Sequence, residues 1–312
     1  MKICRTLLAV LATLGLVLTT GCSSATPAAP TSGKLTVIAA FYPFQFIAER
    51  IGGDQVTVAN LTPPGSEPHD LELSPKQVAS LGQADLVIFQ KGFQPAVDAA
   101  IQTVPPKHAI DTATFLTLQP AASEQGHSED EPADHSEEGA LDPHTWLDPT
   151  NMVAIAEHVR DGLVAANPAA TSTFTANAAT LVTDLKGLDG DFSKGLKSCQ
   201  RQVFITSHEA FGYLAKRYGL EQVGIRGIEP DTEPSAARIA EVQKVARQYG
   251  VTTIFFETLV SPAVAESVAG DLGLATDVLD PLEGLTSASR GADYLEVMRS
   301  NLTALRKANG CS

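Results

Sequence analysis

Short apolar runs rich in β-branched residues alternate with helix-length segments along most of the chain. Four such runs in the first half occupy residues 34–41, 55–61, 84–91 and 108–111. Four in the second half occupy residues 202–207, 221–229, 251–258 and 275–281. Strands separated by helices predict parallel sheets with crossover helices. We therefore expect an α/β fold of two similar lobes whose sheets are mainly parallel.

Helix-start signals support this alternation. Ser74 precedes Pro75 and Gln77, a pattern typical of an N-cap, a proline at the first helical position and a glutamine that reaches back to the cap. Asp148 before Pro149 predicts a second helix, followed by another long helical segment to about residue 197.

These elements define the expected domain organisation. Two lobes are expected at residues 34–149 and 199–312, joined by a long rigid helical link at residues 150–198. In such layouts, ligands lie outside the carboxyl ends of the strands, in the cleft between lobes. Side chains at strand ends are therefore the candidates for binding chemistry.

The amino-terminal segment has the pattern of an export signal and a tether. A positively charged start precedes an apolar run that is too short to cross ~30 Å of hydrocarbon. The segment ending at Cys22 resembles a bacterial lipobox, although Thr19 stands where an aliphatic residue is usual. An ordinary cleaved signal with an incidental cysteine is the alternative. We expect a signal peptide at residues 1–21. A tether at residues 22–33 follows it and begins with the lipidated Cys22.

This arrangement places the protein outside the cytoplasmic membrane, either lipid-anchored or periplasmic. The 312 residues include 22 Lys and Arg against 36 Asp and Glu, a net charge of −14. An acidic surface repels polyphosphates, so no nucleic-acid partner is expected.

Cysteine usage fits an oxidising compartment. Cys4 falls in the signal and Cys22 in the lipobox, which leaves Cys199 and Cys311. Such a pair most simply forms a disulfide, which would tie the carboxyl terminus to the start of the second lobe. The alternatives are two free thiols or a cysteine metal site. A cysteine metal site would be expected to contain a CxxC pair, and the sequence has none.

Three of the seven histidines fall in loops at strand ends or helix starts. His69 follows the second apolar run, His144 precedes the linking helices, and His208 follows the first strand of the second lobe. Neutral imidazole is a common zinc ligand, and three imidazoles with one carboxylate suit a tetrahedral site without thiolates. The carboxylate candidates are Asp280 and Glu283, after the last apolar run. Spacing alone does not identify a site, because the three histidines are far apart in the sequence.

The remaining four histidines do not fit this pattern. His108 opens an expected edge strand, and His158 lies among polar neighbours in an expected helix. His127 and His135 lie in an acidic segment at residues 126–138, which is either a solvated loop or a weak secondary metal-collecting site.

Five phrases of the sequence resemble the zinc-binding proteins of ABC importers, the cluster A-I solute-binding family. In chain order they are GSEPHDLELSPKQ, DPHTWLDPTN, TSHEAFGYLAKRYGL, GIEPDTEPSAARI and LDPLEGL. Together they extend over most of residues 34–305. The resemblance implies two α/β lobes joined by a rigid helix, with the metal held in the cleft by His69, His144 and His208.

The resemblance also implies the metal and its fourth ligand. The manganese branch typically carries glutamate where this chain has His208, and an added imidazole favours zinc by softness and affinity order. In zinc members the fourth position is a carboxylate of the last phrase or a water. We take Asp280 as the fourth ligand and Glu283 as the alternative, and Glu67 is a further carboxylate that could approach the site.

The expected function is extracytoplasmic capture of Zn²⁺, as transported ligand, and its delivery to the membrane permease of an ABC transporter. A monomer without enzymatic activity is expected. The alternatives are a manganese-transporting member of the same family, a surface adhesin lipoprotein with structural zinc, and a zinc hydrolase. His208 and Glu209 begin like the HExxH pattern of zinc peptidases, but Gly212 stands where its second histidine belongs.

Overall fold

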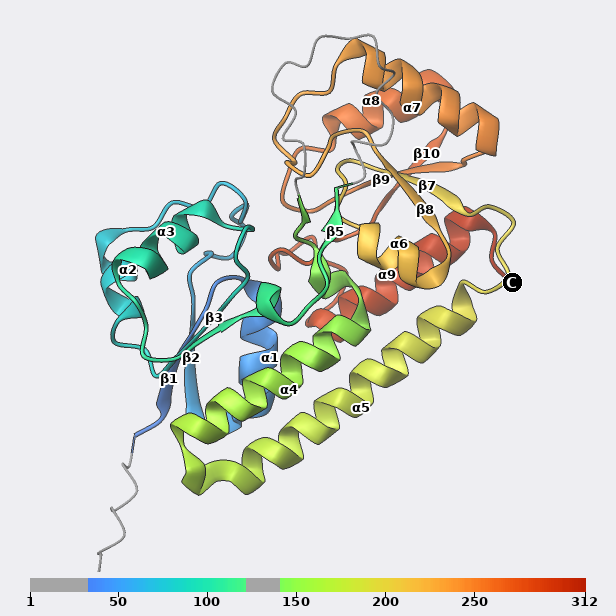
Figure 1. Cartoon of the computed structure of the whole chain (residues 1–312). Helices are drawn as coiled ribbons and strands as arrows, with labels where there is room; N and C mark the ends of the chain where they lie inside the picture. The colour runs from blue at the N-terminus through green and yellow to red at the C-terminus, as the bar shows by residue number, and fades with distance from the viewer. Residues whose placement is uncertain (1–32, 122–140) are drawn as a thin grey trace, which may run out of the picture. The chain divides into compact units, whose positions relative to one another are not determined.

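The computed structural model describes residues 33–121 and 141–312, which belong to one compact unit. The expected signal peptide, Cys22 and the acidic segment at residues 126–138 lie outside the described residues. Figure 1 shows two separate sheets with helices around them, so the expected α/β fold is confirmed.

The first sheet has four parallel strands in the order β2-β1-β3-β4. The strands are β1 (Leu35–Ala39), β2 (Val56–Asn60), β3 (Leu86–Phe89) and β4 (Ala109–Asp111). Every residue of β3 is buried, because a parallel sheet has helices on both faces.

Three helices and several short elements accompany this sheet. The helices are α1 (Tyr42–Gly52), α2 (Pro75–Leu81) and α3 (Pro95–Thr103). The capping box expected at Ser74 is present: Ser74 accepts from the backbone N–H of Gln77, and the Gln77 side chain accepts from the N–H of Ser74. The short elements are η1 (Gly53–Gln55), η2 (Thr112–Thr114), η4 (Thr145–Leu147) and an antiparallel pair, β5 (Gln119–Pro120) with β6 (Leu141–Asp142).

Two long helices follow and run side by side (Figure 1). Helix α4 (Pro149–Ala166) is capped by Asp148, whose carboxylate accepts from the N–H of Thr150. The turn η5 (Pro168–Ala170) leads into α5 (Thr171–Gly195), whose 25 residues span about 37 Å at 1.5 Å per residue. Helix α5 packs against α1 in the first half of the chain and α9 in the second, so it is the long connecting helix that was expected.

The second sheet repeats the architecture with four parallel strands in the order β10-β9-β7-β8. The strands are β7 (Val203–Thr206), β8 (Glu221–Gly224), β9 (Thr253–Phe256) and β10 (Ala275–Val278). The helices are α6 (Gly212–Tyr218), α7 (Ala236–Tyr249), α8 (Ala263–Leu272) and α9 (Tyr294–Asn309).

Successive side chains of these strands point to opposite faces and enter two different cores. Phe204 and Phe255 join a large core that extends through α5, α9 and the first sheet. Ile205 and Ile254 join a smaller core beneath α7 and α8. The cysteines expected to pair do so: Cys199 and Cys311 form a disulfide that joins the segment before β7 to the end of α9.

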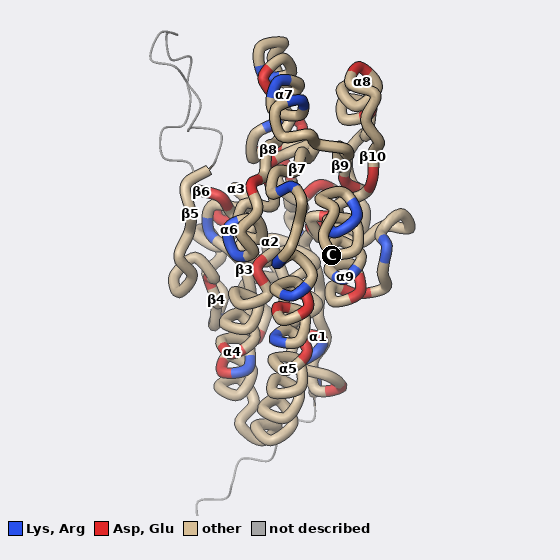
Figure 2. Tube along the Cα trace, turned by 90° about the vertical axis from the view of Figure 1, so that its right-hand side faces the viewer, with Lys and Arg blue, Asp and Glu red and all other residues tan. Residues whose placement is uncertain are grey.

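Charged residues are absent from the central strands of both sheets. Strands β1, β3, β7 and β9 carry none, and Figure 2 shows the charged positions on helices and loops. Within the described part of the chain, no helix has both the length and the apolar character needed to cross a membrane.

Candidate metal centre

His69 lies in the irregular connection between β2 and α2. Its side chain is almost fully buried, and the ring of Phe93 packs edge-on against it with 4.8 Å between ring centroids. The backbone N–H of His69 donates to Glu67 Oε1 over 3.1 Å. On the Nδ1 side, Glu229 Oε2 lies 3.4 Å away.

His144 follows β6 and caps the short helix η4. Both its backbone N–H and its Nδ1 lie within hydrogen-bond distance of Asp142 Oδ1, at 2.9 and 2.8 Å. Gly212 leaves room for Asp142, because a Cβ at Gly212 would lie 2.6 Å from Asp142 Oδ2. Trp146, fully buried beside His144, donates from Nε1 to the Pro281 carbonyl over 2.7 Å and so joins this loop to the second half of the chain.

His208 follows the carboxyl end of β7. Its Nδ1 lies 2.9 Å from Glu257 Oε1, and Ser207 Oγ donates to the same oxygen over 2.5 Å. Glu257 is buried and comes directly after β9, the strand next to β7. The parallel register of the two strands therefore brings their first loop residues together.

Glu283 supplies the carboxylate that meets the imidazoles. It is fully buried in the loop after β10 and follows Leu282, whose φ is +60°. A leucine in the left-handed region is strained, and such strain is retained where the surroundings fix it, commonly at functional sites.

Asp280, taken as the fourth ligand from the sequence, is outside the cluster and stabilises this turn instead. Its Oδ1 accepts from the Leu282 N–H over 2.8 Å, and its Oδ2 accepts from Ser289 and Thr258 over 2.8 and 3.2 Å. Its backbone is held by the side chain of Asn301 on α9. With both of its oxygens held by these partners Asp280 is not among the converging ligand atoms, and the alternative candidate Glu283 is.

The four side chains converge on one point. Within the described residues, one ligand atom from each of His69, His144, His208 and Glu283 lies within 4.8 Å of the others. Glu283 Oε1 is 3.2 Å from His144 Nε2 and 3.5 Å from both His69 Nε2 and His208 Nε2. The Nε2 atoms of His144 and His208 are 3.4 Å apart. A tetrahedral Zn²⁺ with bonds of about 2.0–2.1 Å has ligand atoms about 3.3–3.4 Å apart, so these four separations are close to those of a zinc coordination shell.

Each imidazole also has a carboxylate on its other nitrogen. Asp142, Glu257 and Glu229 face the Nδ1 atoms of His144, His208 and His69 respectively. A carboxylate at Nδ1 fixes the proton there and leaves the Nε2 lone pair for a metal.

The residues of the cluster strongly shift one another's pKa values. Burial alone would raise the pKa of Glu283, but hydrogen bonds from the three histidines hold it well below its usual range. Burial opposes protonation of His69, whereas hydrogen bonds with Glu229 and Glu283 raise its pKa to about 10. The lowered pKa of Glu283 and the raised pKa of His69 mean that each group favours its charged form beside the other.

Glu67, the further carboxylate that the sequence suggested, borders the cluster without joining it. Burial and repulsion by Glu283 raise the pKa of Glu67 to about 8. Asp70, directly after His69 in the sequence, lies exposed beside Asp231, and it is Glu229 that faces Nδ1 of His69.

Glu257 and Glu229 were not among the candidates that the sequence pattern indicated. Glu257 ends the apolar run at residues 251–258, so the strand-end rule that identified His208 would have found it. Glu229 ends the expected run at residues 221–229, but β8 ends at Gly224, so Glu229 lies in the loop that follows a shorter strand than expected.

Other candidate residues lie elsewhere. His158 is exposed on α4 and stacks on Phe115 with 3.7 Å between ring centroids, while His108 is an exposed residue before β4.

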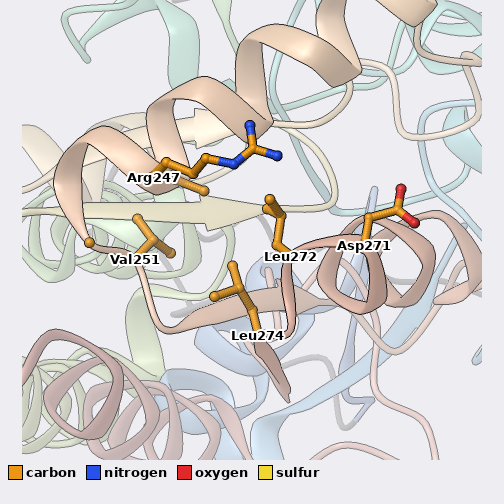
Figure 3. Close-up of a pocket in the computed structure, with 7 residues that line it drawn as sticks. Arg247, Val251, Asp271, Leu272 and Leu274 are labelled. Atoms are coloured by element: carbon orange, nitrogen blue, oxygen red, sulfur yellow. The ribbon is translucent and has the colours of Figure 1, made fainter.

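A cavity of about 290 Å³ lies at the other end of the second sheet, where Val251 and Leu274 precede β9 and β10. Figure 3 shows the residues that line it. Its charged lining residues are Arg247 and Asp271, so it contains none of the converging ligands.

Comparisons with known proteins match the chain to zinc-binding and zinc-uptake proteins. A family model described as zinc-uptake complex component A, periplasmic (ZnuA), matches residues 37–308. The zinc-binding lipoprotein AdcA of Streptococcus pneumoniae is 38% identical over 283 residues, covering 88% of this chain and 56% of AdcA. The chain therefore spans little more than half the length of that relative.

Two further matches cover their counterparts almost completely. The high-affinity zinc uptake system protein ZnuA of Bacillus subtilis is 34% identical over 297 residues, 93% of each chain. The crystal structure of the Zn(II)-bound ZnuA-like domain of Streptococcus pneumoniae AdcA aligns with a TM-score of 0.74 and 35% identity, over 89% of this chain and 99% of that one.

Proposed function

The chain belongs to the ZnuA family of zinc-uptake components, and on that premise we propose that it captures Zn²⁺ outside the cytoplasmic membrane and delivers it to the permease of an ABC importer. One observation carries the proposal: three buried imidazoles converge on one buried carboxylate, whose Oε1 lies 3.2–3.5 Å from a nitrogen of each, close to the ligand separations of a tetrahedral zinc site.

The proposed ligands are His69, His144, His208 and Glu283. Two come from each lobe, with the lobes taken as residues 34–149 and 199–312 and the link as residues 150–198. An ion held this way cross-links two halves of the chain, so its binding free energy adds to the stability of the closed, folded form.

The donor set supports zinc over manganese. Three nitrogen donors and one carboxylate suit zinc, whereas manganese favours sites richer in oxygen. The names of AdcA and ZnuA as zinc-binding and zinc-uptake proteins support the same metal, ahead of the manganese, adhesin and hydrolase alternatives.

We propose binding without catalysis. A zinc hydrolase needs a general base beside an open coordination position. The carboxylate offered for that role, Glu209, pairs with Arg238 over 3.0 Å, and a carboxylate bound to a guanidinium is a poor base. Reversible zinc retention without turnover of esters or peptides is the expected behaviour.

The proposed location and partners depend on family relationships. The lipoprotein name of AdcA supports a lipid anchor at Cys22, which stays a prediction because Cys22 lies outside the described residues. We propose that the protein acts as a monomer that presents its loaded cleft to the permease.

Zinc titration of the metal-free protein tests the proposal. We expect one Zn²⁺ per molecule, and a large loss of affinity in His208→Ala, because His208 is one of four ligands. His158→Ala, an exposed histidine of α4, is the matched control and should bind like the wild type. Affinity is measured by competition with a chromophoric chelator, and wild-type affinity in His208→Ala would refute the ligand assignment.

Transport is tested in cells from which the gene is deleted. Uptake of radioactive zinc at low external concentration should fall, and wild-type protein should restore it. His208→Ala produced at equal level should not restore uptake. Equal uptake with either form would separate zinc binding from transport and refute the proposed delivery.

A further inference from the structure

One short turn contacts both ligand loops of the first lobe. The turn is Gln90–Gln94, which begins directly after β3 and ends at the N-cap of α3. Gln90 and Gln94 are almost completely buried although both are polar, at 3% and 2% exposure. Buried amides need partners, so the position of those partners indicates what the glutamines hold.

Gln90 binds both residues that flank His144. Its Nε2 donates to the Pro143 carbonyl over 2.5 Å, and its Oε1 accepts from Thr145 Oγ1 over 2.6 Å. Thr112 Oγ1 donates to the same Oε1 over 3.1 Å. The backbone on each side of this imidazole is therefore fixed to the end of β3.

Gln94 performs the corresponding role for His69. Its Nε2 donates to the Pro68 carbonyl, directly before His69, over 3.2 Å, and to Thr62 Oγ1 over 3.0 Å. Thr62 in turn donates to the Ala40 carbonyl over 2.8 Å, which joins the loop to the end of β1. Two polar side chains of one turn thus fix two loops that have no regular secondary structure at the histidines.

Phe93, between the two glutamines, packs against the imidazoles themselves. Its ring is 4.8 Å from the His69 ring and 6.3 Å from the His144 ring, measured between centroids. The turn is itself rigid, because Asp111 accepts from the Lys91 N–H over 3.0 Å and Asp98 accepts from the Gly92 N–H over 2.9 Å. Gly92 has a φ of +86°, which a side chain would disfavour.

We propose that the Gln90–Gln94 turn is the positioning element of the metal centre, which sets zinc affinity by fixing His69 and His144 at the spacing a tetrahedral ion requires. The inference rests on the proposed zinc function. It concerns residues that touch the ligand loops and make no contact with the metal. Removing a residue that positions a metal ligand typically lowers metal affinity by roughly 10- to 100-fold.

The test compares three glutamine-to-methionine variants, which keep side-chain length and remove the amide. Gln90→Met and Gln94→Met should each weaken zinc binding by roughly 10- to 100-fold. Gln77→Met is the matched control, because Gln77 also donates to a backbone carbonyl, that of Leu61, and accepts from a hydroxyl, yet flanks no ligand. It should retain wild-type zinc affinity.

Three measurements separate positioning from general stability. Zinc affinity comes from chelator competition, stability from denaturant unfolding of the metal-free proteins, and site geometry from the visible spectrum of the Co²⁺ form. We expect the cobalt spectrum to change in Gln90→Met and Gln94→Met and to stay unchanged in Gln77→Met. If Gln90→Met does not fold, Gln90→Glu replaces it, because it keeps the acceptor for both threonines and removes the donation to Pro143, and denaturant unfolding of the same variant measures the cost of the buried charge that it adds.

The outcomes distinguish this inference from the function on which it rests. Wild-type affinity and cobalt spectra in the Gln90 and Gln94 variants would overturn the inference and leave the zinc function intact. A loss of affinity that merely parallels the loss of stability in all three variants would overturn it as well. A wild-type protein that binds no zinc would refute both.

Discussion

Asp280 and Glu283 are carboxylates of the same loop with different partners. Asp280 accepts hydrogen bonds from Leu282, Ser289 and Thr258, so both of its oxygens are occupied within its own lobe. Glu283 faces three imidazoles. Because Asp280 holds the N–H of the strained Leu282, we infer that it orients Glu283 without binding the metal.

Alanine substitutions distinguish these roles. Glu283→Ala removes a ligand and should weaken zinc binding more than Asp280→Ala, for which the expected loss is roughly 10- to 100-fold. Ser289→Ala removes one of the hydrogen bonds to Asp280 and should have the smallest effect of the three. Affinities come from chelator competition at constant pH. A greater loss in Asp280→Ala than in Glu283→Ala would restore Asp280 as the ligand.

The histidines were accessible to sequence analysis, whereas the choice between these carboxylates was not. His69, His144 and His208 stand in loops that a strand-and-helix pattern identifies. The direction of Glu283 depends on the positive φ of Leu282 and on Asn301, which contacts Asp280 from 21 residues away. A leucine gives no sequence signal for a left-handed backbone, so the pattern left both carboxylates open.

At the scale of elements, all eight expected strands correspond to strands of the two sheets, and polar caps mark several helix starts. Ser74, Asp148 and Ser235 each accept a hydrogen bond at the start of a helix. Helix α1 lacks such a cap, because Phe41 at its N-cap provides no side-chain hydrogen bond. The two-residue strands β5 and β6 are too short to show any alternation.

The ion pair between α5 and α6 predicts how the free energy of unfolding depends on pH. Asp189 on α5 accepts two hydrogen bonds from Arg217, both at 2.9 Å, and one from Tyr218 at 3.0 Å. The Arg217 guanidinium holds the pKa of Asp189 below its usual range. Because the folded-state pKa is lowered, the stabilisation is complete above the unfolded value near ~3.9 and is lost as pH falls through the folded value.

Asp189→Asn should therefore lower the free energy of unfolding by about 1 kcal/mol at neutral pH. The difference from wild type should stay constant down to about pH 5 and shrink at lower pH. Asp191→Asn removes the same charge from an exposed position on the same helix and serves as the control. Denaturant unfolding at several pH values measures both variants, and a difference that grows on acidification would contradict the assignment.

At the scale of the whole molecule, the two lobes share one large core. Helices α5 and α9 contribute to it together with the first sheet. Tyr294 of α9 donates to the Trp146 carbonyl over 2.6 Å, and Trp146 donates to Pro281, next to the loop of Glu283. Packing and hydrogen bonds between the two halves of the chain therefore help to bring together ligands from distant parts of the sequence.

The disulfide lies at the other end of this framework and should act on stability alone. Cys199 and Cys311 are 112 residues apart, and Cys199 precedes the amino end of β7, whereas His208 follows its carboxyl end. Closing a loop of this length restricts the unfolded chain, so Cys199→Ala/Cys311→Ala should lose about 2–4 kcal/mol of unfolding free energy.

Zinc affinity of this double variant should stay at the wild-type value, because every ligand and its hydrogen-bond partners remain. Denaturant unfolding and chelator competition on the same samples measure the two quantities, with reduced and alkylated wild type as the control. A parallel fall in zinc affinity would mean that the spacing of the ligands depends on the link between α5 and α9.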